Sequence, residues 1–318
     1  MSSFSTEVKN ELARLIDPTE CCKIAELAAL MRMGATMSIG GKNFGLNFTT
    51  ENAAIARKTL TLLKESYPVE TSVMVSKARR LKKNNSYFIK VAPSPVVTEL
   101  LTTLGIMQGD NLNVGKDIGI LRKECCRRVY LRGAFLGGGS VNKPESDYHL
   151  ELVTGNYSFA QVLVSLLKRF DLPVGITDRK NDYIIYLKDS DAIIDFLSII
   201  GAEDAIVDFE VAKNVKDVRN QVNRLVNCET ANLQKTVNAA CRQVERIHLI
   251  KAKIGLDKLP ENLQEIAILR LNYPEATLQE LVVAMGNKVG KSGINHRLRK
   301  LEQIAIELIE GDMHENKK

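Results

Sequence analysis

The sequence predicts an α+β protein in which one αββαββα unit occurs twice and an all-α domain follows. Three observations support this fold class. A phrase that begins Glu-Cys-Cys starts at residue 20 and again at residue 124, and the correspondence between the two copies covers about 85 residues with one substantial gap. Helix-type and strand-type hydrophobic periodicities follow the same order in both copies. After about residue 210 the repeat ends, and only helical patterns continue.

Composition and charge narrow the class of protein. The chain has 318 residues, 45% of them hydrophobic and 26% charged, which is typical of a globular protein with two or three domains. No run of 18 apolar residues occurs, and the N-terminus lacks the apolar core of a signal peptide. We therefore expect a cytoplasmic protein without a membrane partner. The net charge of +6 permits a nucleic-acid partner but does not require one.

The cysteines and histidines show no metal-binding spacing along the chain. No CxxC pair exists and the four histidines are far apart, so we predict neither a metal site nor a cofactor. In a cytoplasmic chain we expect the cysteines to be reduced, small and buried. The alternative is a redox pair that forms across the two repeats. The six cysteines are Cys21, Cys22, Cys125, Cys126, Cys228 and Cys241.

Each repeat begins with an apolar helix that contains small residues. Ala29 and Gly133 would let the two first helices approach closely at a two-fold seam. Asn52 and Asn156 are expected to cap the next helices, at about 53–65 and 157–169, and Ser5 or Thr6 to cap a helix before the repeats. We predict an N-terminal helix at 1–19, repeats at 20–108 and 109–208, a helical linker at 209–255, a helix–turn–helix domain at 256–311 and a tail at 312–318.

The two first helices resemble degenerate LAGLIDADG motifs of homing endonucleases, over 27–35 and 131–139. That resemblance implies a saddle-shaped, DNA-binding pseudo-dimer, here a monomer with an internal pseudo-two-fold axis. In that family an acid at the eighth motif position binds the catalytic divalent metal, which requires oxygen ligands. Gly34 and Gly138 occupy those positions, and the next acids downstream are Glu51 and Glu145. The sequence therefore predicts no catalytic residues and no enzyme activity.

Two further basic segments could contact phosphates. The tip of the first repeat's hairpin carries a charge run, which could instead be a solvated tip that discourages edge pairing. A polar face of the helical linker could touch phosphates or form an interdomain contact. The auxiliary DNA contacts predicted from these segments are Lys77, Arg79, Arg80, Lys82, Lys83, Arg219, Asn223 and Arg224.

The C-terminal part predicts three helices in helix–turn–helix order. Pro260 starts the first, and Thr277 with Glu280 forms a capping box for the second, which Gly286 ends. Ser292 is expected to cap the third, whose N-terminal turns would enter the major groove of DNA. The alternative is an ordinary helical bundle with a solvated basic face. The predicted DNA-binding residues are Thr277, Gln279, Lys288, Lys291, Ser292, Asn295, His296, Arg297, Arg299 and Lys300.

Nearly end to end, the chain resembles the WhiA family of sporulation and cell-division regulators. The residues that carry this resemblance are the two ECC-led helices, RLVNCETANLQKTVNAA (224–240) and SGINHRLRKLEQIA (292–305). It implies a non-enzymatic, nucleoid-associated regulator of transcription that binds specific sequences in double-stranded DNA, in sporulation or in cell division and chromosome segregation. A second transcription factor or RNA polymerase is a further expected partner. The alternative is a protein- or ligand-binding scaffold with a vestigial endonuclease fold.

Overall fold

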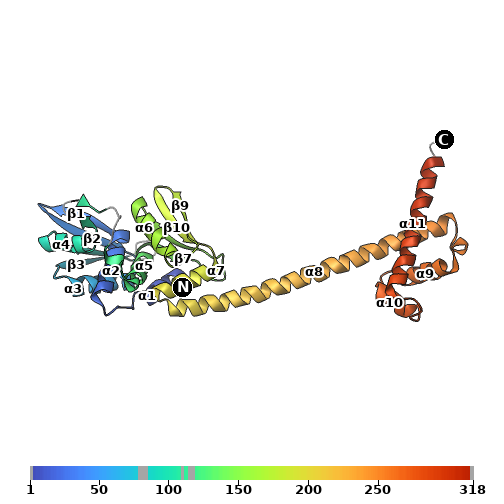
Figure 1. Cartoon of the computed structure of the whole chain (residues 1–318), viewed down its shortest axis with the longest axis horizontal. Coiled ribbons are helices and arrows are strands. Elements are labelled where there is room, and N and C mark those ends of the chain that lie inside the picture. Colours follow the sequence, from blue (N-terminus) through green and yellow to red (C-terminus); the bar gives the residue numbers. More distant parts are fainter. Residues whose placement is uncertain (1–2, 78–84, 109–110, 114–118, 316–318) are drawn as a thin grey trace. The chain divides into compact units, whose positions relative to one another are not determined.

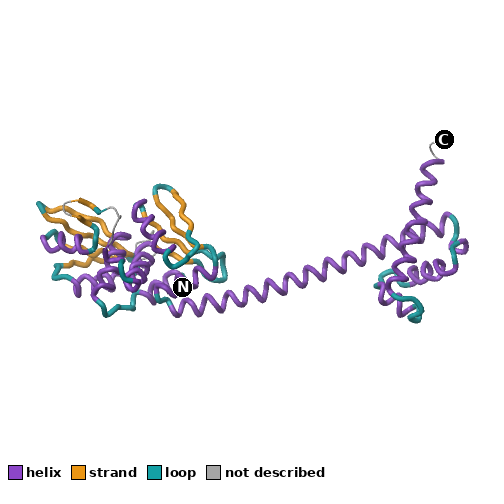
Figure 2. Tube along the Cα trace, viewed as in Figure 1, coloured by secondary structure: helices purple, strands orange, loops and turns teal. Residues whose placement is uncertain are grey.

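The chain divides into two compact units, residues 1–217 and 218–318. The computed structural model describes residues 3–77, 85–108, 111–113 and 119–315. The first unit contains helices and strands, whereas the described part of the second is helical (Figures 1 and 2). Within the described residues, no helix combines the length and apolar character that a membrane span requires.

The predicted order of elements is confirmed in both repeats of the first unit. The first repeat consists of α2 (Glu20–Gly34), β1 (Ala35–Gly40), β2 (Asn43–Thr50), α3 (Ala53–Ser66), β3 (Thr71–Ser76), β4 (Ser86–Val91) and α4 (Pro95–Thr103). The second consists of α5 (Glu124–Gly138), β7 (Gly139–Val141), β8 (Leu150–Thr154), α6 (Tyr157–Lys168), β9 (Gly175–Arg179), β10 (Asp182–Leu187) and α7 (Ser190–Ile200). The duplication seen in the sequence is therefore a duplication of structure.

Each repeat forms an antiparallel sheet of the same topology. The strand orders are β1-β2-β4-β3 and β7-β8-β10-β9. Phe48 pairs with Ile89 in the first sheet, and the equivalent residues Leu152 and Ile185 pair in the second. All four side chains are buried, because alternate residues of each strand face the helices. A short hairpin of β5 (Met107–Gln108) and β6 (Asn111–Leu112), followed by the 3-10 helix η1 (Gly119–Leu121), comes after the first repeat and was not expected.

In the first unit the helix caps follow the sequence signals in two places and depart from them in one. The Asn52 side chain accepts a hydrogen bond from the Ala54 amide at 2.8 Å, and Asn156 accepts one from Phe159 at 2.9 Å, as predicted. The cap of α1 (Phe4–Leu12), however, is Ser3 rather than Ser5 or Thr6. The helix begins earlier because its buried stripe of Phe4, Val8 and Leu12 starts at its first residue.

Helices α2 and α5 pack against each other along the seam between the repeats. A Cβ atom on Gly133 would overlap the backbone oxygen of Glu26 and lie 3.0 Å from the Cβ of Ala29. One turn further on, a Cβ on Gly137 would lie 2.5 Å from the Cβ of Met33. The close approach predicted for Ala29 and Gly133 is confirmed, since only glycine leaves room for the facing backbone here.

The second unit is built on the end of a long helix. Helix α8 (Glu203–Lys253) begins in the first unit and ends in the second. The 3-10 helix η2 (Leu256–Lys258) and helices α9 (Glu261–Asn272), α10 (Leu278–Ala284) and α11 (Lys291–Glu315) follow. Their shared core consists of Ile247, Ile250, Leu259, Leu263, Ile266, Ala267, Leu281, Val282, Met285, Ile294, Leu298, Leu301 and Ala305.

The expectation that the cysteines are buried is only partly correct. All six are free thiols, and Cys22 and Cys126 are buried. Cys21 is half-buried, whereas Cys125, Cys228 and Cys241 are exposed. Cys228 is exposed because residues 217–238 of α8 form a continuous stretch of exposed helix.

Candidate nucleic-acid interface

The second and third helices of the C-terminal unit are joined by a tight turn. The Thr277 amide donates to Glu280 Oε2 at 2.7 Å, and the Glu280 amide donates to Thr277 Oγ1 at 3.3 Å, which confirms the capping box. Hydrogen bonds that the Glu280 carboxylate accepts from the backbone and side chain of Thr277 lower the pKa of Glu280. Gly286 and Asn287 then adopt φ angles of 67° and 59°, a left-handed conformation that turns the chain out of α10. Helix α11 begins at Lys291, so Ser292 lies inside its first turn rather than at the predicted cap.

Buried contacts hold α11 on its neighbours. Ile294, Leu298 and Leu301 are at most 1% exposed and pack with Leu281 of α10. The buried Arg270 guanidinium donates to the Ala276 carbonyl at 2.6 Å and so fixes the loop that enters α10. Burial lowers the pKa of Arg270. The sequence analysis did not identify this arginine. A cation among the apolar residues of a predicted helix could have indicated it.

One face of α11 is exposed and rich in groups that can contact nucleic acid. Ser292, His296 and Arg299 are spaced four and three residues apart, which places them on the helix face opposite the core stripe. Residues 288–300 contain five Lys or Arg residues and no acid. The predicted DNA-binding residues that are exposed are Thr277, Gln279, Lys288, Lys291, Ser292, His296, Arg299 and Lys300.

The other two predicted residues, Asn295 and Arg297, are half-buried. The Arg297 guanidinium donates to the backbone oxygen of Asn262 at 3.4 Å and lies 3.7 Å from Glu265 Oε2. Both partners belong to α9, so Arg297 ties α11 to α9. It therefore differs from Arg299, two residues further along α11, whose side chain is exposed.

The strands of the first unit offer few cations to a polyanion. The eight strands of the two sheets contain two basic residues, Lys90 and Arg179, and three acidic ones, Glu151, Asp178 and Asp182. Of the predicted hairpin-tip cations, Lys77 is exposed, while Arg79, Arg80, Lys82 and Lys83 lie outside the described residues. The predicted auxiliary residues of α8, namely Arg219, Asn223 and Arg224, are all exposed.

The two positions where a nuclease would carry its metal-binding acids are sterically closed. Gly34 and Gly138 are the last residues of α2 and α5. A Cβ on Gly34 would lie 2.7 Å from the ring of the buried Phe48. A Cβ on Gly138 would lie 2.7 Å from the Val153 backbone oxygen. An aspartate at either position would require its neighbours to move.

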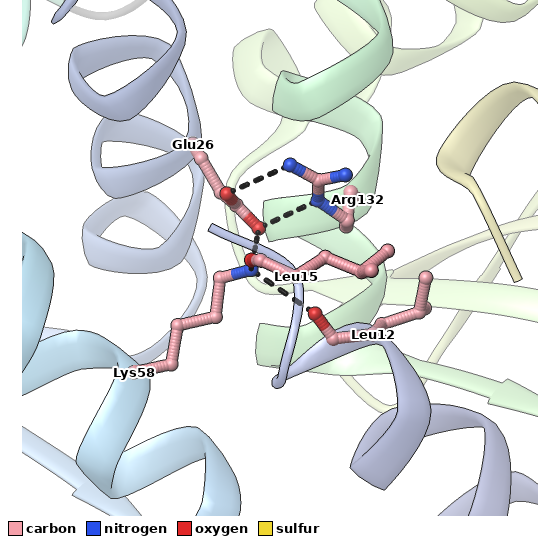
Figure 3. A network of polar contacts seen from close by, with 5 residues as sticks. All are labelled: Leu12, Leu15, Glu26, Lys58 and Arg132. Carbon is pink, nitrogen blue, oxygen red and sulfur yellow. Dashed lines mark hydrogen bonds and ion pairs between the residues drawn. The ribbon is translucent and has the colours of Figure 1, made fainter. Parts of the chain in front are cut away.

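A buried ionic network links the repeats near the middle of the same helices, and sequence reasoning did not identify it. Glu26 of α2 lies 2.7 Å from Lys58 Nζ of α3 and 2.9 Å from Arg132 Nε of α5 (Figure 3). The Lys58 ammonium also donates to the backbone oxygens of Leu12 and Leu15. Burial lowers the pKa of Lys58, against the opposing attraction of Glu26.

Three family profiles match consecutive parts of the chain. The WhiA N-terminal LAGLIDADG-like domain matches residues 20–107, and the WhiA LAGLIDADG-like domain matches residues 127–219. The WhiA C-terminal HTH domain matches residues 222–305. The chain belongs to the WhiA family.

Relatives and a solved structure agree with this assignment. A probable cell division protein WhiA of Desulforamulus reducens is 51% identical over 314 residues, which is 97% of each chain. Another WhiA, of Clostridium botulinum, is 48% identical over 97% of this chain and 99% of its own. The crystal structure of full-length WhiA from Thermotoga maritima matches with a TM-score of 0.59 and 27% identity, over 96% of this chain and 99% of that one. The WhiA resemblance and the predicted fold class are confirmed.

Proposed function

We propose that this WhiA-family chain is a non-enzymatic, sequence-specific DNA-binding regulator that reads double-stranded DNA with its helix–turn–helix unit. The observation that carries the proposal is the exposed face of α11 around Ser292, His296 and Arg299, within a segment of five cations and no acid. A rigidly mounted, basic helix after a tight turn is what entry into the major groove requires.

The side chains on this unit suit two kinds of contact. Arg299 can donate two hydrogen bonds to guanine, and Asn295 can pair with adenine, on base edges in the major groove. Lys288, Lys291 and Lys300 can neutralise phosphates and set the orientation of the helix. Thr277 and Gln279, at the start of α10, would approach the adjacent backbone. Arg297 would act by holding α11 on α9.

The first unit would retain the endonuclease-like architecture without its chemistry. Glycines at positions 34 and 138 supply no side-chain oxygen ligand for a divalent metal. Incubation of the full-length protein with supercoiled plasmid and Mg²⁺ tests this part, and we expect no nicking. Plasmid cleavage that persists after further purification without a chelator, and that stops when a chelator is added, would contradict the absence of nuclease activity.

We place the regulator in the cytoplasm, in association with the nucleoid, as a monomer with an internal pseudo-two-fold axis. Two relatives above are named probable cell division proteins, which supports a role in cell division and chromosome segregation or in sporulation. Regulation of transcription would bring it to RNA polymerase or to a second transcription factor at the same DNA.

Fluorescence anisotropy of the full-length protein tests the proposal. The duplexes are the DNA upstream of the protein's own gene and a scrambled duplex of equal length and composition, each over a salt series. We expect tighter binding to the upstream duplex and an affinity that falls as salt rises, because phosphate neutralisation releases counterions. Failure to bind any duplex would overturn the proposal.

A scaffold that binds a ligand through the first unit is a second candidate, favoured by one cleft. This cleft has a volume of about 1320 Å³, and its lining includes the basic residues Lys9, Arg14 and Arg57 and one acid, Glu51. An anionic ligand would suit that charge. The scaffold alternative predicts that Arg14→Ala and Arg57→Ala leave DNA binding unchanged and that the protein as a whole shows no preference among duplexes.

A further inference from the structure

The two Glu-Cys-Cys phrases bring four thiols together at one end of the seam. The sulfur atoms of Cys21, Cys22, Cys125 and Cys126 all lie within 4.8 Å of one another. Cys21 and Cys22 lie in the first turn of α2, and Cys125 and Cys126 lie at the same positions in α5. The packing of α2 on α5 therefore converts two sequence-distant pairs into one four-sulfur cluster.

The separations suit a single tetrahedral ion. A tetrathiolate site with metal–sulfur bonds of ~2.3 Å places its sulfurs ~3.8 Å apart. The sulfur atoms here are at most 4.8 Å apart, which exceeds the tetrahedral separation by about 1 Å. Small side-chain rotations can close that difference. A disulfide would join only two sulfurs at ~2.0 Å and leave the other two outside the bond.

Positive groups lie beside the cluster, and they oppose the burial that raises the pKa of Cys22 to about 11 and also raises the pKa of Cys126. Cysteines in the first helical turn lie beside backbone amides that have no intrahelical partner, and the positive end of the helix dipole stabilises negative charge there. Two such helix ends, those of α2 and α5, meet at this cluster. The Lys123 ammonium lies 3.7 Å from the Cys21 sulfur and adds a third source of positive charge. A divalent ion with four thiolates carries a net charge of −2, which these groups offset.

We propose that Cys21, Cys22, Cys125 and Cys126 bind one zinc ion in a closed tetrathiolate site that fastens the two repeats together. Each thiol releases its proton to solvent as its sulfur binds, and no oxidant or reductant is needed. Cys22 and Cys126 are buried and anchor the ion, while the exposed Cys125 leaves a route from solvent. Soft thiolates select zinc over Mg²⁺.

This site differs from the one that a homing endonuclease would use. Gly34 and Gly138 lie at the C-terminal ends of α2 and α5, whereas the cysteines lie at the N-terminal ends. The sequence predicted no metal site here because the two cysteine pairs are 104 positions apart, whereas zinc-type spacing lies within one segment of the chain. The feature that could have indicated the site is that a Cys-Cys pair occurs on each of two helices that were expected to pack together.

Cobalt substitution tests the proposal on the full-length chain. The reduced protein is stripped with a chelator, titrated with Co²⁺ and then challenged with Zn²⁺. We expect saturation at one equivalent of Co²⁺, with sulfur-to-metal charge transfer and the intense visible bands of tetrahedral cobalt, and loss of both when Zn²⁺ is added. Zinc should also raise the melting temperature of the first unit, because it binds only the folded state.

Two double variants make the test specific. Cys21→Ser/Cys125→Ser removes the two less buried members of the cluster, and Cys228→Ser/Cys241→Ser removes two exposed thiols elsewhere. The first should lose the cobalt spectrum while keeping the circular dichroism and metal-free melting temperature of the wild type, and the second should keep the spectrum. Absence of a one-equivalent cobalt signal in the folded, reduced wild type would overturn the proposal. Equal loss in both variants would overturn it too, as would a disulfide found by mass spectrometry in a protein that binds no metal.

Discussion

Glu26 and Arg132 form a two-contact ion pair between the repeats, with Nε 2.9 Å from Oε1 and Nη2 3.1 Å from Oε2. Both side chains are buried. The equivalent positions in the opposite repeats are Tyr130 and Ala28, so the pair has no symmetric copy. The duplicated halves have therefore become specialised, and each half supplies one partner of a contact that neither could make with a second copy of itself.

Loss of the Glu26 carboxylate should destabilise the first unit strongly. Glu26→Ala leaves Lys58 and Arg132 as buried cations without their shared anion, and we expect a loss of about 3–5 kcal/mol in the free energy of unfolding. Glu124→Ala is the matched control, because its pair with Arg128 is exposed and should contribute less than about 1 kcal/mol. Urea denaturation measures both. Equal losses of unfolding free energy in the two variants would show that the buried network contributes no more to stability than an exposed ion pair.

The close contact between α2 and α5 leads to a second prediction. Gly133→Ala would force the α2 and α5 backbones apart, and we expect a cost of about 1–3 kcal/mol from overpacking. Gly155→Ala serves as the control, since its Cβ would meet its nearest neighbour at 3.7 Å, an ordinary contact. The melting temperature of the first unit should fall for the former and change little for the latter. An unchanged melting temperature for Gly133→Ala would mean that the helices are not so tightly packed.

The buried hydroxyl of Tyr130 should be dispensable. Among the described residues it has no hydrogen-bond partner, and its burial raises the pKa of the phenol. Tyr130→Phe removes an unsatisfied polar group and keeps the ring, so we expect a gain of about 1 kcal/mol or no change. Denaturant unfolding beside the exposed-site control Tyr157→Phe measures this. A loss above about 1 kcal/mol would reveal a partner for the hydroxyl, such as a bound water.

The lysine at position 9 gives a pH-dependent prediction. Burial lowers the pKa of Lys9 to about 8, whereas an unfolded lysine titrates near 10.4. Between these values the unfolded chain binds more protons, so the stability contributed at this residue rises with pH. Lys9→Met should therefore stabilise the first unit at pH 7, by about 1 kcal/mol or more, and this advantage should shrink by pH 10.

Urea unfolding of Lys9→Met and the wild type at pH 7 and pH 10 measures the difference between them. Lys90→Met, at an exposed strand position, is the matched control for loss of a lysine charge. An advantage of Lys9→Met that is the same at both pH values would mean that Lys9 keeps an ordinary pKa in the folded protein.

Local signals in the sequence identified most of the fold. The caps at Asn52 and Asn156 and the capping box at Thr277 each depend on residues close together in sequence, and each was confirmed. The cap of α1 was misplaced because Ser3, Ser5 and Thr6 are all competent caps, and the choice depends on where the buried stripe begins.

The features that sequence reasoning missed depend on tertiary packing. Glu26 looked like an isolated acid in an apolar helix, and its partners lie 32 and 106 positions away. Arg297 and Arg299 were both predicted to bind DNA, and the contacts that Arg297 makes with α9 separate their roles. The candidate DNA-binding face was predictable because a helix surface follows from its own periodicity, whereas the four-cysteine cluster required the packing of two helices.

The central claim is that the exposed face of α11 binds DNA, and Arg299→Ala tests it most directly. Fluorescence anisotropy on the upstream duplex over a salt series would compare this variant with Arg128→Ala, which removes another exposed arginine, from α5 of the first unit. Arg299→Ala should weaken binding by about 1–3 kcal/mol with an unchanged melting temperature. Arg128→Ala should bind as the wild type does. If Arg299→Ala binds the duplex as tightly as the wild type at every salt concentration, the α11 face is not the DNA-reading surface.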